Sequence, residues 1–220
     1  MDYRRARKRN SQLKAKRAGK KTLSSRVKKI EHFINDSVEK KCKDLVAYSA
    51  NITNAGYANY PMFQLAQGDG NDQREGDKVS LRKGTLHLTL TRGDTSNIIR
   101  VLVVVTPSAT PLGLADVLEY ASTSAHGDLP FGSPYQIKAS NNEQTYSVLA
   151  DRTYQLKGDM STIVAKIPIK IPKRGKSCEF VGTGAVSPNN YNVSLLMISD
   201  STASPHPTAS YAMRWKYVDL

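Results

Sequence analysis

The charge of this chain is divided unevenly along its length, and this division limits what its N-terminal part can fold into. Residues 1–30 contain 13 Lys or Arg and one acidic residue, Asp2, whereas the rest of the chain contains 19 basic and 18 acidic residues. The first segment carries a net charge of +12, out of +13 for the whole chain. Such a segment cannot fold alone, because like charges repel and few apolar residues offset the lost chain entropy. The sequence therefore predicts a nearly neutral folded body preceded by a cationic arm.

The cations of this arm are the candidate nucleic-acid-binding residues, because a segment of such charge density binds polyphosphate by releasing condensed counterions. The arm has one aromatic residue, Tyr3, so base stacking contributes little and we expect phosphate binding without sequence readout. The compact run Arg4–Arg9 is also typical of a nuclear localisation signal. The candidate binding residues are Arg4, Arg5, Arg7, Lys8, Arg9, Lys14, Lys16, Arg17, Lys20, Lys21, Arg26, Lys28 and Lys29.

The segment from Ser25 to about Val46 shows the apolar spacing of three and four that is typical of one face of a helix. The residues of this face are Val27, Ile30, Ile34, Val38, Cys42 and Leu45. Several lysines lie on the other face, so this amphipathic helix could dock on the body, meet phosphate, or do both. The predicted organisation is an arm and helix over residues 1–46, a linker over 47–66 and a folded domain over 67–220.

From residue 79 onward the pattern is that of β-strands. Val79–Arg92 alternates Leu with His and Thr, as in a half-buried strand, and Ile98–Thr106 is almost wholly apolar and β-branched, as in a central strand. Turn-forming residues separate six further predicted strands, at 145–150, 152–157, 162–171, 178–181, 193–199 and 210–218. Eight short antiparallel strands predict an all-β sandwich or jelly roll. Pro107–Glu143 is expected to be a long exposed connection with a short helix near Leu114–Tyr120.

Two motifs in this body resemble those of a known family. The loop QGDGNDQREGDKV, ending at Val79, looks like the corresponding loop in coat proteins of the satellite tobacco necrosis virus type and of small circular single-stranded DNA viruses with the same fold. The matching positions are Gln67, Gly68, Asp69, Gln73, Arg74, Gly76, Asp77 and Val79. The stretch Tyr146–Thr153 is similar to the family's apolar strand followed by Leu, any residue, Asp, any residue and Thr. The resemblance implies an eight-stranded antiparallel jelly roll with a basic N-terminal arm.

The same resemblance implies a viral coat protein that self-assembles into a small icosahedral shell, T=1 with about 60 copies. It implies that the arm packages a single-stranded genome, DNA or RNA, and that the protein resides in the virion after assembly in the host cytoplasm or nucleus. The charge division fits this role, because a nearly neutral body lets neighbouring copies pack without repulsion. The alternative is a cellular nucleic-acid chaperone with a jelly-roll body. A lectin-like jelly roll is disfavoured because it leaves the arm unexplained.

The acidic loop offers hard oxygen ligands for calcium, without the spacing of an EF-hand. These candidate ligands are Asp69, Asp72, Glu75 and Asp77. Calcium at subunit interfaces is common in similar capsids. We nevertheless favour the simpler interpretation of a solvated turn, with Arg74 or Asp77 in a salt bridge between subunits.

An enzyme is the least expected class. The histidines are scattered, and the sequence contains no HExxH, GxSxG or P-loop motif. Two cysteines, Cys42 and Cys178, form no disulfide framework or metal site. The sequence has no run of 18 apolar residues, so no membrane span is predicted. The basic N-terminus lacks the pattern of a secretory signal, and an intracellular protein is therefore expected.

Overall fold

The computed structural model describes residues 23, 25–27, 40–108, 110–118 and 146–220. Residues 25–27 are helical, as expected at the start of the predicted helix. The rest of the arm, the middle of that helix and residues 119–145 of the long connection lie outside the described residues. The chain divides into two compact units, Met1–Glu39 and Lys40–Leu220, and the second unit contains the fold.

Nine strands and one short helix make up the described part of the second unit. They are β1 (Lys41–Asn51), β2 (Tyr57–Asn59), β3 (Lys78–Thr91), β4 (Ser96–Thr106), α2 (Leu114–Val117), β5 (Ser147–Lys157), β6 (Thr162–Ile169), β7 (Lys176–Glu179), β8 (Asn192–Ser199) and β9 (Thr208–Asp219). No helix among the described residues is long and apolar enough to cross a membrane.

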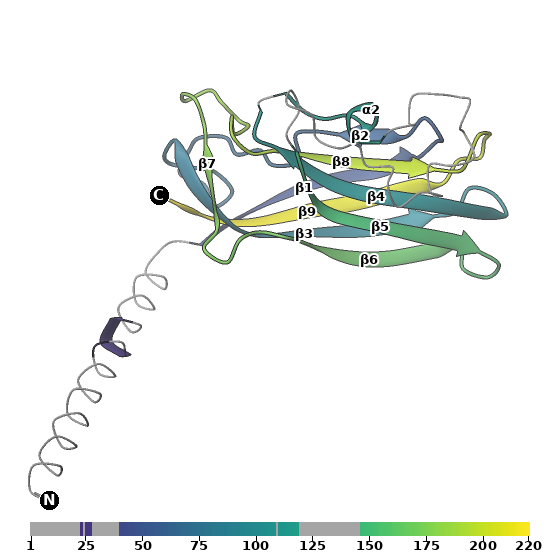
Figure 1. The fold of residues 1–220 in the computed structure, drawn as a ribbon, viewed down its shortest axis with the longest axis horizontal. Helices are drawn as coiled ribbons and strands as arrows, with labels where there is room; N and C mark the ends of the chain where they lie inside the picture. Colours follow the sequence, from purple (N-terminus) through teal and green to yellow (C-terminus); the bar gives the residue numbers. More distant parts are fainter. Residues whose placement is uncertain (1–22, 24, 28–39, 109, 119–145) are drawn as a thin grey trace, which may run out of the picture. The chain divides into compact units, whose positions relative to one another are not determined.

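The strands form two antiparallel sheets that face each other (Figure 1). The first sheet has the order β1-β9-β3-β6, and β7 also pairs with β3; the second has the order β2-β8-β4-β5. Because β6 pairs with the Gly84–Thr91 part of β3 and β7 with its Lys78–Leu81 part, β6 and β7 occupy one strand position in succession. If β6 and β7 are counted as one, the eight strand positions pair in nested order: β1 with β9, β2 with β8, β3 with β6 and β7, and β4 with β5. This is the pairing of a jelly roll, so the predicted all-β fold is confirmed.

The main core lies between the two sheets. Its centre on β9 is Trp215, which is fully buried, donates an indole hydrogen bond to the Met62 carbonyl at 2.6 Å and packs edge-on against Phe63. Gly84 lies opposite Trp215 on β3, where an added Cβ would be 2.2 Å from the indole ring. Only glycine therefore fits beneath the indole at this position.

Strand β4 has apolar neighbours on both faces, which explains its continuous apolar run. It pairs with β5 and β8, so the predicted central strand is confirmed. Val101 and Val103 face the core between the sheets, whereas Leu102 faces a second cluster that includes Leu114 and Val117 of α2. The predicted short helix is thus present over Leu114–Val117 and docks on the outer face of β4 and β8.

The predicted helix through Val46 and the predicted linker over 47–66 are wrong from Lys41 onward, because this stretch contributes β1, β2 and core residues. Along β1 the inward positions begin with Lys41 and Lys43, so polar side chains hide the period of two. Met62 and Phe63 are fully buried, which is inconsistent with a solvated linker. The compact unit therefore starts at Lys40, well before residue 67.

The strands predicted at 145–150 and 152–157 are one strand, β5. Its pairing with β4 shifts register between Val103 and Val104, which lie opposite Ala150 and Val148, so Leu149 forms a bulge. The predicted number of eight strands thus counts β5 twice and omits β1 and β2.

Candidate functional site at the start of the first strand

The loop over residues 67–77 closes on itself through backbone and amide hydrogen bonds. Gly68 N donates to the Arg74 carbonyl and Arg74 N to the Ala66 carbonyl, both at 2.9 Å. Between these two bonds in the sequence, the Gly70 carbonyl accepts a hydrogen bond from Gln73 N, and Gly70 N donates to Gln73 Oε1, both at 3.0 Å. The motif is therefore a tight turn whose conformation depends on bonds within the loop.

Arg74 fastens this loop to a distant segment and is fully buried. Nη1 donates to the Gly76 carbonyl at 2.7 Å, and Nη2 donates to the carbonyls of Gly182 and Ala185 at 2.9 and 3.0 Å. The guanidinium carbon lies 4.5 Å from the ring centroid of Phe180. A buried guanidinium needs such partners, because an unpaired buried charge is very costly.

The proposed salt bridge of Arg74 across a subunit boundary is therefore wrong. Its carboxylate partner is Asp77 of the same chain, with Nη1 and Oδ1 3.2 Å apart, and Arg74 has no exposed surface to offer a neighbour. The Asp77 side chain is 61% exposed, so its predicted role at a subunit interface stays a prediction.

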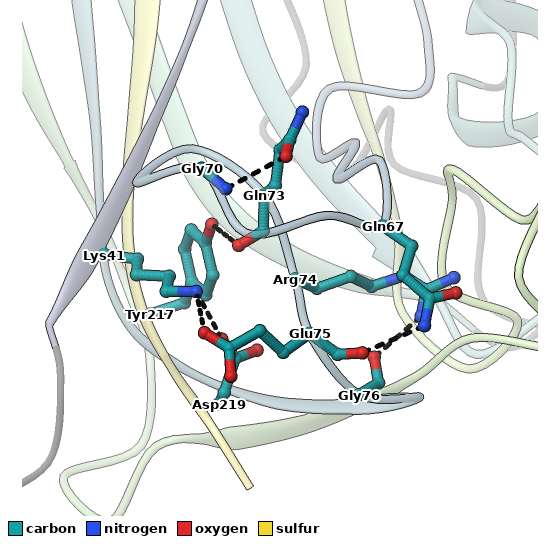
Figure 2. A network of polar contacts seen from close by, with 9 residues as sticks. All are labelled: Lys41, Gln67, Gly70, Gln73, Arg74, Glu75, Gly76, Tyr217 and Asp219. Atoms are coloured by element: carbon teal, nitrogen blue, oxygen red, sulfur yellow. Dashed lines mark hydrogen bonds and ion pairs between the residues drawn. The ribbon is translucent and has the colours of Figure 1, made fainter.

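Lys41, the first residue of β1, is buried and joins three segments of the chain (Figure 2). Its Nζ lies 2.7 Å from Glu75 Oε1 in the loop and 3.0 Å from Asp219 Oδ2 at the end of β9. The hydrogen bond to Glu75 is the main cause that holds the pKa of Lys41 above its ordinary value, against burial, which lowers it. Beside it, Tyr217 donates its hydroxyl to the Gln73 carbonyl at 2.8 Å.

The next residues of β1 contact the same loop. Cys42 N donates to the Asn71 carbonyl at 3.3 Å, and Lys43 Nζ lies 2.6 Å from Asp72 Oδ2. The hydrogen bond from Lys43 lowers the pKa of Asp72 below its ordinary value. We call residues 67–77 the anchor loop, because they fasten β1 where the chain passes from the N-terminal unit into the folded unit.

The carboxylates of the anchor loop face cations and do not converge on one point. Asp72, Glu75 and Asp77 each form an ion pair with Lys or Arg. In the part of the chain that the structure describes, no group of three or more His, Cys, Asp or Glu side chains could hold a metal ion. The ligand cluster that the calcium alternative requires is thus not formed by Asp69, Asp72, Glu75 and Asp77 within one chain.

Comparison with known proteins decides the family. A family model described as satellite tobacco necrosis virus coat protein matches residues 7–220, nearly the whole chain. The chain belongs to this family. Membership confirms the resemblance seen in the sequence, and it implies a structural role in a virion built from copies of the coat protein. No curated protein matches the coat protein in sequence.

Solved structures of other virus proteins are similar to this coat protein at low identity. Desmodium yellow mottle tymovirus matches with 11% identity and a TM-score of 0.39, covering 82% of this chain and 81% of that chain. Turnip yellow mosaic virus matches with 11% identity and a TM-score of 0.38, covering 84% of this chain and 95% of that chain.

The predicted nucleic-acid-binding residues fall almost entirely outside the described residues. Among them Arg26 is described, and it is exposed. Conversely, the ion pairs of Lys41 were missed by sequence reasoning. The motif indicated that the loop matters, but nothing in a single sequence connects Lys41 with Asp219.

Proposed function

We propose that this coat protein assembles into a small closed shell of about 60 copies and packages a single-stranded genome through residues 1–30. The observation that carries the proposal is the charge division, with +12 on those residues and a nearly neutral remainder. About 60 arms bring on the order of 700 positive charges, which favours condensation of a short genome through counterion release.

The anchor loop supports this function by holding the root of the arm. Force on an arm that binds genome reaches the folded unit at Lys40 and Lys41. Lys41 is paired with both Glu75 and Asp219, so the first residue of β1 is fixed to the loop and to β9. The contact between the buried Lys41 and the largely buried Asp219 loses little to salt screening, unlike the exposed cations that meet phosphate.

The test is a full-length variant in which all thirteen arm cations are replaced by Gln. We expect a folded protein that no longer co-purifies with nucleic acid, because its phosphate-binding charge is gone. Absorbance at 260 and 280 nm measures the nucleic acid, and nuclease sensitivity of the wild-type cargo distinguishes RNA from DNA. Cargo of full length in the variant particles would contradict the role of the arm.

Sedimentation tests the shell separately. A subunit of 24.2 kDa in about 60 copies gives a particle of roughly 1.5 MDa without its cargo. Small oligomers in place of such particles would contradict a closed shell and favour the nucleic-acid chaperone.

A further inference from the structure

The outer face of the β1-β9-β3-β6 sheet carries cations from three neighbouring strands. Residues directly opposite each other in antiparallel strands point to the same side of a sheet. Lys216 of β9 lies opposite Lys83 of β3, and His87 of β3 lies opposite Lys166 of β6. Trp215, next to Lys216, points into the core, so this set points away from the core, and its four side chains are exposed.

These lysines have no acidic partners among the described residues. No carboxylate in this part of the chain lies within 4.0 Å of Lys83, Lys166 or Lys216. Acidic side chains on the same face are already paired. Asp44 accepts two hydrogen bonds from Arg214, at 2.8 and 2.6 Å, and Glu179 lies 3.0 Å from Lys78.

The facing pair of Lys83 and Lys216 is unfavourable without an anion. Directly opposite side chains have Cβ atoms about 5 Å apart, and like charges there destabilise a sheet. A sequence selected only for folding would place an acid or a neutral residue at one of the two positions. An external anion turns this repulsion into a shared binding site.

The second sheet shows that an exposed cationic face is not a general property of this fold. The outer face of β4 and β8 is covered by α2, and Leu102 and Leu196 are fully buried there. Arg100 on that face is buried and forms two hydrogen bonds with Asp151, at 3.0 and 2.7 Å. Arg100 is thus paired within the chain, whereas Lys83, Lys166 and Lys216 of the first sheet have no carboxylate partner among the described residues.

Hydroxyl groups extend the first face beyond its cations. Thr89 of β3 lies opposite Ser210 of β9, and Thr91 lies opposite Thr208. Lysines together with Ser and Thr hydroxyls are common donors to phosphate oxygens. The face therefore offers both charge and hydrogen bonds to a phosphate backbone, with no aromatic platform for bases on these positions.

We propose that this surface, the cationic sheet face defined by Lys83, His87, Lys166 and Lys216, binds the phosphate backbone of the single-stranded genome in addition to the arm. The proposal rests on the proposed function, because it supplies a second contact for the same cargo. Lys216 lies opposite Cys42, the residue after Lys41, so the cations begin beside the first residues of β1.

The test compares two full-length double variants of equal charge. Lys83→Gln with Lys216→Gln removes the facing pair, whereas Arg152→Gln with Lys157→Gln removes two exposed cations from β5 of the other sheet. The probes are fluorescent oligothymidylate and oligouridylate, and anisotropy measures binding over a range of salt concentrations. For the first variant we expect the slope of log K against log salt to fall by roughly 1.4, as for two lost phosphate contacts on a single strand. The second variant should keep the wild-type slope.

Two outcomes overturn the proposal while leaving packaging by the arm intact. They are an unchanged slope in the first variant and an equal loss of slope in both variants. An unchanged slope together with a loss of particle mass in the first variant would show that the face contacts a neighbouring subunit instead. A wild-type protein that binds neither probe would overturn the proposed function as well.

Discussion

The anchor loop and the cationic sheet face both present basic side chains, but they treat them in opposite ways. Arg74 and Lys41 are buried, and each is surrounded by carbonyl or carboxylate oxygens. Lys83 and Lys216 are exposed and face each other. A buried charged side chain must be paired within the chain, because an unpaired buried charge is very costly. An exposed charged side chain is solvated by water and needs no such partner. The comparison therefore separates cations that hold the fold from cations that are available to an anion.

The largest expected effect in this comparison is that of Arg74. Arg74→Ala leaves the Ala185 carbonyl without its Arg74 donor, removes one of the two donors to the Gly182 carbonyl and opens a cavity beside Phe180. We therefore expect a loss of about 3–5 kcal/mol in the free energy of unfolding. Equilibrium urea unfolding measures it. Arg74→Lys restores the charge but not the planar fork and should recover only part of the loss. A change below about 1 kcal/mol in the Ala variant would show that Arg74 is not a structural cation.

Lys41 is expected to have the second largest effect. Lys41→Met keeps the length of the side chain but leaves the largely buried Asp219 carboxylate without its cation. We expect a loss of about 2–3 kcal/mol, at the low end for a broken buried pair because Glu75 is 56% exposed. Lys43→Met is the matched control, since its partner Asp72 is exposed and such pairs contribute at most about 1 kcal/mol. Equal losses in the two variants would remove the distinction between them.

Buried groups should also make stability depend on alkaline pH. Burial raises the pKa of Cys178 from 9.0 to about 12. The stability that this group contributes is complete below pH 9 and is lost as the pH rises toward 12, because the unfolded chain ionises first. By pH 10.5 the loss from Cys178 is about 2 kcal/mol. Burial also raises the pKa of Tyr191 and Tyr211, which adds to the same trend.

Thermal unfolding between pH 7 and 10.5 measures this dependence. We expect a smaller drop in Tm for Cys178→Ala than for the wild type over the same interval. Identical curves for Cys178→Ala and the wild type would rule out the buried thiol as a source of the pH dependence.

The smallest expected effect has the opposite sign. Lys216→Gln relieves the repulsion with Lys83, so the free energy of unfolding should rise by about 0.2–1 kcal/mol. Arg214→Gln, two residues away, loses its pairing with Asp44 and should lower the same quantity by a similar amount. Chemical denaturation at low salt measures both, and a destabilised Lys216→Gln protein would show that Lys216 has a structural partner.

The sequence predicts those parts of the fold whose residues face one environment consistently. In β3, Leu86, Leu88 and Leu90 alternate with polar residues, and β4 is apolar on both faces, so both strands are identified. Strand β1 was missed because Lys41 and Lys43 occupy inward positions, where an apolar residue is expected. Their burial depends on Glu75, Asp72 and Asp219, and nothing within β1 itself reveals those partners.

The site was predictable to a similar degree. The Gly- and Asp-rich motif identified the anchor loop, whereas the arm that the charge division predicts lies almost wholly outside the described residues and stays a prediction. The burial of Arg74 was not predictable, because an Arg in a polar loop is usually solvated and its partners at 182 and 185 belong to a distant segment. The cationic sheet face was also missed, since Lys83, Lys166 and Lys216 come together only through the register of three strands.

The nested strand order also has a consequence for how the protein is made. Asp44 of β1 and its partner Arg214 of β9 are 170 positions apart, and β9 separates β1 from β3 in the sheet. At a synthesis rate of about 5–20 residues per second, β1 waits on the order of 10–30 s for its neighbour to be translated. Residues 1–30, with their net charge of +12, are made before β1. A chain interrupted before residue 208 lacks β9, the strand that joins β1 to β3, so an incomplete translation product cannot close this sheet.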